Sequence, residues 1–287
     1  MQAFVITAYQ SPSYLTDLIN RITTDGDHAY VHIDTKSSIT PEELKLTNPD
    51  RVHLYQKYSI NWGSYNHLAA IIFLLQQLPD NIEYVHIISG QDMPIRSPRQ
   101  FVDKFNNCKQ SFMTVTPLSR TDTSVRRRLE GYNLFPNADS RKPIFRAVNK
   151  AVWAIRHILH IDNHKIGEFT DIYKGMIWAS LPYEQIEYVL EYIRSHQGFI
   201  KKLKHTLLPE EFFLQTILMN SKFRDAIVTN NLHYTVWEKK HGSLPALLDE
   251  EDYGDIMKSE CFFARKIALP YSKTLIAKID SVLRENA

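Results

Sequence analysis

Residues 1–100 alternate apolar runs of strand length with longer segments of helical periodicity, and this alternation limits the possible folds sharply. It predicts an α/β domain with a mostly parallel sheet, because parallel strands need a crossover connection, usually a helix, between them. The expected strands are Phe4–Tyr9, Ala29–Ile33, Val52–Tyr55 and Tyr84–Ile88. The expected helices between them are Ser13–Thr23 and Ser64–Leu78, the second ending before Pro79.

The rest of the chain has the same α/β character. Its expected elements are an amphipathic helix Pro182–Ser195, a helix opened by Pro209, a strand over Ala226–Trp237 and a closing helix over Ser272–Arg284. Neither an internal repeat nor a long polar linker interrupts the 287 residues. We therefore expect one compact domain.

The charge balance argues against nucleic acid as the main partner. The 34 Lys and Arg residues nearly match the 32 Asp and Glu residues, for a formal net charge of +2. The basic residues gather in segment 119–160, which has nine Arg or Lys and three acids. This segment is either a solvated loop with a basic helix face or a site for an anionic ligand. Nucleic-acid binding is a third interpretation, and a steep salt dependence of oligonucleotide affinity would be its signature.

The cysteines and the hydropathy pattern suggest a location. Cys108 and Cys261 are too few for a disulfide framework, so we expect free, buried thiols in a reducing compartment. No signal peptide or membrane span is evident, since the longest apolar run, Leu68–Leu75, is too short to cross a bilayer. The expectation is a cytoplasmic protein, with peripheral contact at the inner face of the membrane left open.

Several common nucleotide and nucleophile motifs are missing. The turn after the first strand, residues 8–13, lacks the glycines of a dinucleotide fold, which argues against NAD and FAD. The chain also lacks a P-loop and a Gly-x-Ser-x-Gly elbow. Kinase-like P-loop chemistry and α/β-hydrolase chemistry are therefore disfavoured.

No resident metal is expected. The single Asp-x-Asp, Asp25-Gly26-Asp27, falls in a turn at the amino end of the sheet, away from the ligand edge. His157, His160 and His164 have helical spacing but no paired carboxylate. The rival hypothesis is a metal-dependent transferase that uses Asp25-Gly26-Asp27 or Glu250-Glu251-Asp252, and loss of activity in EDTA would favour it.

Charged residues lie at positions where an α/β sheet binds ligands. Asp34 closes the second strand, where it either binds a ribose or uracil group or serves as a turn residue. Glu210 and Glu211 follow Pro209, where they either complement a helix dipole or, desolvated by aromatic neighbours, supply a general base. Arg265 and Lys266 follow an apolar strand as exposed charges or as an anion clamp.

Six segments, taken in chain order, resemble the Core-2/I-branching glycosyltransferase family, which also includes the peptide-O-xylosyltransferases. The segments are Val31–Ser37, Trp62–Ser64, Tyr84–Ile95, Lys174–Trp178, Pro209–Phe213 and Phe263–Lys266. They extend over nearly the whole chain. The resemblance implies a GT-A-type nucleotide-sugar-binding fold, with residues 1–110 as the nucleotide-binding half and residues 111–287 as the acceptor-binding and catalytic half.

The resemblance also implies a metal-independent reaction that inverts the anomeric centre. Glu211 matches the family's general base, with Glu210 in the variable place of the motif. Lys266 matches the residue that contacts the diphosphate, Arg265 assists it, and Asp34 holds the nucleoside. The co-substrate is a UDP-sugar, with UDP-GlcNAc as the first candidate and UDP-xylose or another UDP-sugar held open.

For the acceptor, a glycan or a lipid-linked saccharide, the resemblance implies contacts with Trp237 and with the region of Arg126, Arg127 and Arg128. The animal enzymes carry a further diphosphate-binding arginine, for which Lys239-Lys240-His241 is a poor match. Their membrane anchor, stem and disulfides have no counterpart here, which suggests a bacterial member of a polysaccharide pathway. The rival hypothesis outside the enzymes is a non-catalytic relative that binds a glycan or a nucleotide.

Overall fold

The computed structural model describes residues 1–24, 26–159, 161 and 166–285. It confirms the α/β fold: a seven-stranded central sheet has the order β10-β6-β9-β4-β1-β2-β3. In chain order its strands are β1 Gln2–Ala8, β2 His28–Ile33, β3 Val52–Tyr55, β4 Tyr84–Ser89, β6 Ser111–Met113, β9 Ala179–Pro182 and β10 Ile227–Val228. Neighbouring strands are parallel except at β9, which runs antiparallel to both β4 and β6.

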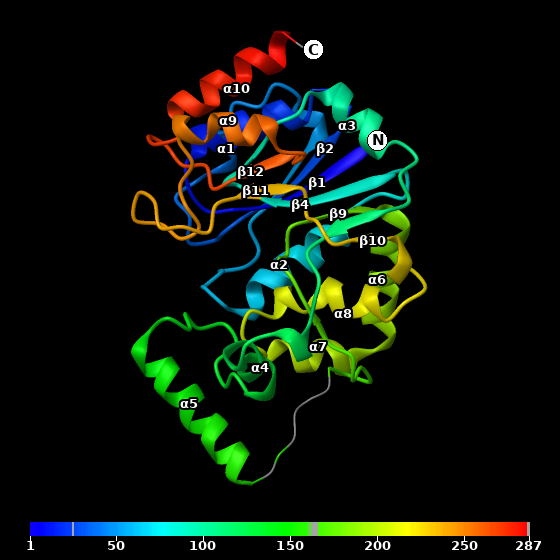
Figure 1. Ribbon diagram of the computed structural model, residues 1–287, viewed down its shortest axis with the longest axis vertical. Helices are drawn as coiled ribbons and strands as arrows, with labels where there is room; N and C mark the ends of the chain where they lie inside the picture. Colours follow the sequence, from blue (N-terminus) through cyan, green and yellow to red (C-terminus); the bar gives the residue numbers. More distant parts are fainter. Residues whose placement is uncertain (25, 160, 162–165, 286–287) are drawn as a thin grey trace.

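Helices cover both faces of this sheet (Figure 1). On one face lie α1 Pro12–Ile22, α3 Pro98–Phe105, α9 Tyr253–Lys258 and α10 Lys273–Glu285. On the other lie α2 Tyr65–Leu75, α6 Tyr183–Ser195, α7 Gln197–Lys204 and α8 Phe213–Met219. The helices α4 Thr123–Glu130 and α5 Pro143–Ile158 lie beyond this second layer, far from α10. None of the helices in the described residues is both long and apolar enough to span a bilayer.

The core is divided by the sheet into two packed layers. Successive side chains of a strand point to opposite faces, so Phe4 and Ile6 pack with α1 and α3, whereas Ala3 and Val5 pack with α2, α6 and α8. All four side chains are buried. A parallel strand covered on both faces is apolar at nearly every position, which explains the continuous apolar run from which β1 was predicted.

A second, three-stranded sheet stands beside the central one. Its order is β11-β12-β5, with β11 His233–Thr235, β12 Phe263–Arg265 and β5 Asp92–Pro94. Because β12 runs antiparallel to β5, Arg265 is paired with Asp92 across the ladder. A short ribbon of β7 Thr116–Pro117 and β8 Tyr173–Lys174 completes the strands of the described residues.

The expected strand over Ala226–Trp237 is wrong. The structure divides it into β10 and β11, which belong to different sheets. The side-chain oxygens of Asn230 and Asn231 accept hydrogen bonds from the backbone N–H groups two residues further on, and Leu232 has a left-handed φ of 58°. These local hydrogen bonds end one strand and redirect the chain into the next.

Three smaller expectations also need correction. Tyr9 lies outside β1, and α2 ends at Leu75 rather than Leu78. Pro209 opens only a 3-10 turn, η4 Pro209–Glu211, and α8 begins at Phe213, because the Glu211 carbonyl accepts its hydrogen bond from Gly175 instead of from a helical residue. Cys108 and Cys261 are free thiols, as expected, but they are only partly buried.

Candidate functional site

The ends of three parallel strands are tied together at the carboxyl edge of the sheet. The backbone N–H of Asp34, after β2, donates to the Ala8 carbonyl at 2.8 Å. The N–H of Gly90, after β4, donates to the Thr7 carbonyl at 2.9 Å. Side chains that follow β1, β2 and β4 therefore meet at one edge, where doubly wound sheets bind their ligands.

Glu211 is a largely buried carboxylate held between two cations. Its Oε2 accepts a hydrogen bond from Arg128 Nη1 at 2.9 Å and lies 3.1 Å from Lys174 Nζ. Burial raises the pKa of Glu211, while Lys174 and Arg128 act in the opposite direction, and burial dominates. The result is a carboxylate whose basicity exceeds that of an exposed glutamate, a property that suits a general base.

The segment that carries Lys174 is pressed against the Glu211 turn. The Gly175 N–H donates to the Glu211 carbonyl at 2.8 Å, and Gln215 Nε2 in α8 donates to the Met176 carbonyl at 2.7 Å. A Cβ at Gly175 would lie 1.8 Å from the carbonyl oxygen of Thr114. Only glycine permits this approach, so a larger residue at position 175 would displace the segment that carries Lys174.

Glu210 belongs to a chain of polar contacts that reaches β1. The Glu210 carboxylate is buried, and its Oε1 lies 3.1 Å from His67 Nδ1 in α2. His67 Nε2 lies 3.3 Å from Thr7 Oγ1 in β1. Sequence reasoning gave Glu210 only a variable place in its motif and missed His67, because an isolated histidine on an apolar helix carries no distinguishing signal.

Arg265 and Lys266 differ in their surroundings. Arg265 is not an exposed charge: its side chain is 11% exposed, and its Nη1 donates to Asp92 Oδ1 at 2.6 Å and to Ser89 Oγ at 2.5 Å. Its guanidinium carbon lies 3.9 Å from the centre of the Trp178 ring. Lys266 is partly buried, which together with Arg265 lowers the pKa of its amine. The charge of Asp92 acts on this pKa in the opposite direction, but no ion pair of the Lys266 amine is found in the described part of the chain.

One short segment connects the two groups of charges. Lys174 contacts Glu211, and Trp178, four residues further on, stacks on Arg265. The segment Lys174–Trp178 thus contacts both the Glu211 carboxylate in the η4 turn and the Arg265 guanidinium at the end of β12. Lys174 belongs to one of the six segments that resemble the family, but the sequence predicts no role for it. Its contact with Glu211 is seen only in the fold.

The remaining residues singled out from the sequence occupy different positions. Asp34 is buried and forms a turn, since its Oδ1 accepts from the Lys36 N–H at 2.9 Å. Trp237 is 60% exposed on the small sheet's rim. No contact in the described residues ties Asp34 or Trp237 to Glu211, so the structure leaves their expected ligand roles as predictions.

The three arginines of α4 do not form one surface. Arg128 contacts Glu211, whereas Arg126 donates to the backbone carbonyls of Thr121 and Ser119 at 3.3 and 3.4 Å. The Arg127 guanidinium carbon lies 4.7 Å from the centre of the Trp153 ring in α5. A helix turns by about 100° per residue, so three consecutive side chains point in different directions.

The acidic segments considered for a metal have other partners. Asp27 Oδ1 accepts from the Gln2 N–H at 2.8 Å at the amino end of the sheet, and Asp25 lies outside the described residues. Asp252 accepts a hydrogen bond from Lys240 Nζ at 3.0 Å. His160 and His164 also lie outside the described residues. Within the described ranges no group of three or more His, Cys, Asp or Glu side chains is arranged to hold a metal ion.

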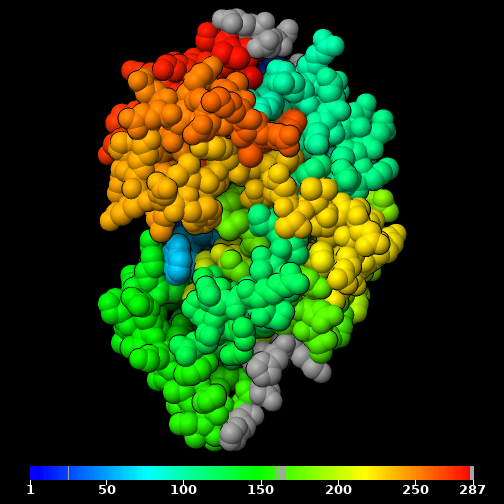
Figure 2. Space-filling model, viewed as in Figure 1, coloured from blue at the N-terminus to red at the C-terminus, as the bar shows by residue number. Residues whose placement is uncertain are grey.

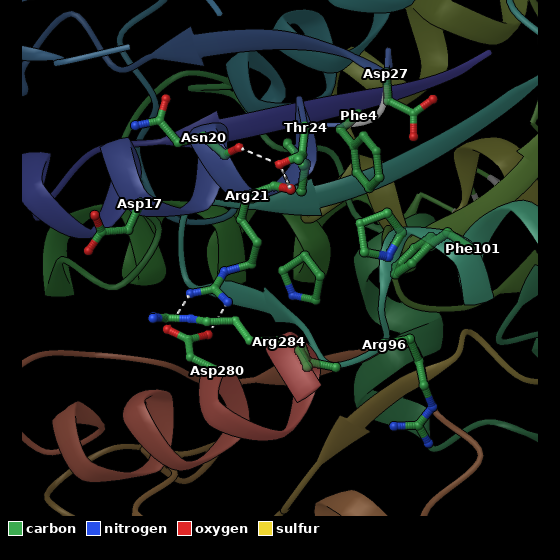
Figure 3. A pocket seen from close by; sticks show the side chains of 14 residues that line it. Phe4, Asp17, Asn20, Arg21, Thr24, Asp27, Arg96, Phe101, Asp280 and Arg284 are labelled. Carbon is green, nitrogen blue, oxygen red and sulfur yellow. Dashed lines mark hydrogen bonds and ion pairs between the residues drawn. The ribbon is translucent and has the colours of Figure 1, made fainter. Parts of the chain in front are cut away.

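A cavity of about 480 Å³ between α1, α3 and α10 lies at the other end of the sheet (Figure 3). Its wall includes the ion pair between Arg21 of α1 and Asp280 of α10, which joins the two helices. Asp27, from the amino-end turn, also lines it. None of the groups around Glu211 contributes to this cavity. Figure 2 shows instead a hollow between the C-terminal segments, in orange, and the α4–α5 region, in green.

Comparison with known proteins identifies relatives of the whole fold. A family model described as Core-2/I-Branching enzyme matches residues 2–256. Xylosyltransferase oxt of Drosophila melanogaster is 23% identical over 280 residues, covering 88% of this chain and 30% of that protein. Xylosyltransferase 1 of Rattus norvegicus is 23% identical over 312 residues, covering 99% of this chain and 35% of that protein. The chain spans about a third of the length of these curated relatives.

Proposed function

This chain belongs to the Core-2/I-branching enzyme family, a family of glycosyltransferases, and from this we propose that it transfers a sugar from a UDP-sugar to a hydroxyl group of a glycan or lipid-linked saccharide. The observation that carries the proposal is the environment of Glu211. Its carboxylate is desolvated and its pKa is raised. The neighbouring Glu210 connects its turn, through His67, to Thr7 near the carboxyl end of β1, the edge at which sheets of this type bind ligands.

In the proposed reaction, Glu211 accepts the proton of the acceptor hydroxyl. The hydroxyl oxygen forms a bond to the anomeric carbon from the face opposite the leaving group. The bond between that carbon and the phosphate oxygen breaks, and UDP departs with the electron pair. An α-linked donor therefore gives a β-glycoside, so the transfer inverts the anomeric centre.

The departing diphosphate needs positive charge. Lys266 is the cation best suited to supply it, because Arg265 already pairs with Asp92 whereas no acid in the described residues pairs with Lys266. Lys266 would thus perform the task that a divalent cation performs in metal-dependent transferases. Arg265 would contribute as a fixed neighbour, and Asp34, in the 1–110 half, would accept hydrogen bonds from the nucleoside.

Donor choice rests on the family resemblance of the sequence segments and on the names of the curated relatives. The resemblance makes UDP-GlcNAc the first candidate, whereas the curated relatives are named xylosyltransferases, which favours UDP-xylose as the second. The two sugars differ in size at two ring positions, so one or two pocket side chains decide between them. The acceptor side of the proposal places Trp237 and the α4 arginines near the incoming glycan.

The test begins with thermal shifts of the purified chain in UDP, UDP-GlcNAc, UDP-xylose, UDP-glucose, UDP-galactose and, as a control, GDP, each with EDTA and with manganese. A ligand that binds only the native state raises the melting temperature. We expect a UDP-dependent shift that persists in EDTA. A shift that requires manganese would instead favour the metal-dependent rival.

The second step separates catalysis from binding. With the donor that gives the largest shift, UDP release is measured on a panel of glycan acceptors for the wild type and Glu211→Gln. We expect Glu211→Gln to abolish UDP release and to keep the UDP shift. Normal turnover in this variant would overturn the assignment of the base. Ligand binding by both proteins without any turnover would favour the non-catalytic rival.

A further inference from the structure

The helix α5 presents an apolar stripe to the exterior. Ile144, Ile155 and Ile158 are 64%, 56% and 73% exposed. Together with the exposed Ala147 and Ala151, they repeat at intervals of three or four residues, which places all five on one face of the helix. An isoleucine row on an exposed helix face is unusual for a protein surrounded only by water.

A cationic stripe runs beside the apolar one. Arg146 and Lys150 are exposed and lie four residues apart, and α5 contains no acidic residue. Lys142, directly before the helix, extends the positive charge, whereas the neighbouring Arg141 is paired with Asp139 at 2.9 Å. The net charge of the whole chain is only +2, so this concentration of cations is local.

The opposite side of α5 attaches the helix to the protein. The rings of Phe145 and Phe135 have centroids 5.4 Å apart, and Asn149 Nδ2 donates to Asn133 Oδ1 at 3.1 Å. The Trp153 ring contacts Arg127 of α4. These contacts fix the direction of the helix, which lies at the end of the molecule farthest from α10 (Figure 1). The residues of both stripes are exposed there.

We propose that the outward face of α5 docks on the surface of an anionic lipid bilayer. A helix with one apolar and one basic face lies in the plane of the membrane interface, with its apolar side chains among the acyl chains and its cations at the head groups. Anionic head groups match the cationic stripe in charge. A second copy of this chain fits less well, because a symmetric contact would bring the two cationic stripes together.

This surface is coupled to the site by α4. Neighbouring residues of α4 contact both places: Arg127 packs on Trp153 of α5, and Arg128 holds Glu211. Docking of α5 would therefore hold the Glu211 carboxylate close to the bilayer, within reach of a lipid-linked substrate. The docking itself does not depend on the proposed function, since it is a property of α5 alone.

The test measures sedimentation of the purified chain with vesicles, without donor or acceptor. The vesicles are of phosphatidylcholine alone or of phosphatidylcholine mixed with phosphatidylglycerol. We expect binding to the mixed vesicles only, decreasing as salt is added. The triple variant Ile144→Ser/Ile155→Ser/Ile158→Ser is expected to lose at least about tenfold in partitioning. Arg146→Gln/Lys150→Gln is expected to lose about fivefold for each cation removed.

Matched variants provide the controls. Lys201→Gln/Lys204→Gln removes two exposed cations from α7, and Leu244→Ser removes an exposed apolar side chain elsewhere. Both are expected to bind like the wild type. Equal binding to neutral vesicles, absence of binding, or equal losses in the controls would overturn the proposal. A wild-type dimer that the triple isoleucine variant dissociates would assign the stripe to a second copy instead.

Discussion

The ammonium group of Lys174 lies 3.1 Å from the Glu211 carboxylate. The two residues are distant in the sequence, and the contact exists because β8 ends beside the η4 turn. A cation at this distance favours the charged carboxylate, yet burial has the larger effect and the pKa of Glu211 remains raised. Lys174 thus limits how far burial can suppress ionisation of the proposed base.

Replacement of Lys174 tests this balance. In Lys174→Met the pKa of Glu211 should rise further, because burial remains while one opposing cation is lost. The base acts only when deprotonated, so the acid limb of the kcat/KM profile should move to higher pH. Lys204→Met, on the exposed side of α7, is the control and should leave the limb in place. If the acid limb of Lys174→Met were unchanged or moved to lower pH, Glu211 could not be the base whose ionisation the limb reports.

Lys266→Ala tests the proposed diphosphate contact. A charge-assisted hydrogen bond to a phosphate contributes about 1.5–3 kcal/mol, so UDP affinity should fall about tenfold to a hundredfold. Isothermal titration with UDP measures this directly. Lys239→Ala, which removes an exposed cation from the segment after β11, should bind UDP like the wild type. If both variants lose affinity equally, a diffuse positive field rather than a specific contact would explain the binding.

Gly175→Ala tests the close approach of Gly175 to the Thr114 carbonyl. The added Cβ would lie 1.8 Å from the Thr114 carbonyl oxygen, so the backbone must move. We expect a loss of about 3 kcal/mol or more in the free energy of unfolding, measured by urea denaturation. Gly198→Ala, in helix α7, is the matched control, because nothing lies within 4 Å of its added Cβ. That variant should gain up to about 1 kcal/mol.

His86 should make stability depend on pH. Burial lowers its pKa from 6.5 to about 3, with Nδ1 2.8 Å from Ser180 Oγ and Nε2 2.7 Å from Gln2 Oε1. Below pH 6.5 His86 is therefore protonated in the unfolded chain but stays neutral in the folded chain. The free energy of unfolding then falls as the pH falls. Between pH 7 and 5 this group should cost about 2 kcal/mol.

Urea denaturation at the two pH values measures this cost. His86→Gln should be less stable than the wild type at pH 7 but should lose less stability on going to pH 5. His157→Gln, at an exposed position of α5, should keep the wild-type dependence. An unchanged pH dependence in His86→Gln would mean that other groups produce the effect.

Local sequence patterns were sufficient for the first four strands of the central sheet, β1 to β4, but they did not predict β6 or β9. The strands β2 and β3 and the helices α1 and α6 agree with the expected ranges to within one residue at each end. Each is long enough, and periodic enough, for burial on one or both faces to show in the residue order. The split between β10 and β11 could not be found in this way, because two asparagine side chains interrupt an otherwise continuous apolar pattern.

The sequence by itself determined the α/β class, the likeness to a glycosyltransferase family and Glu211 as the candidate base, because these depend on local periodicity and on short motifs. Only the tertiary structure decided which side chains contact Glu211, Glu210 and Arg265. Arg128, Lys174, His67 and the pairing of Arg265 with Asp92 come from elements far apart in the chain. Burial and charge pairing are properties of the packed molecule, so the pKa of Glu211 follows from the fold rather than from its motif.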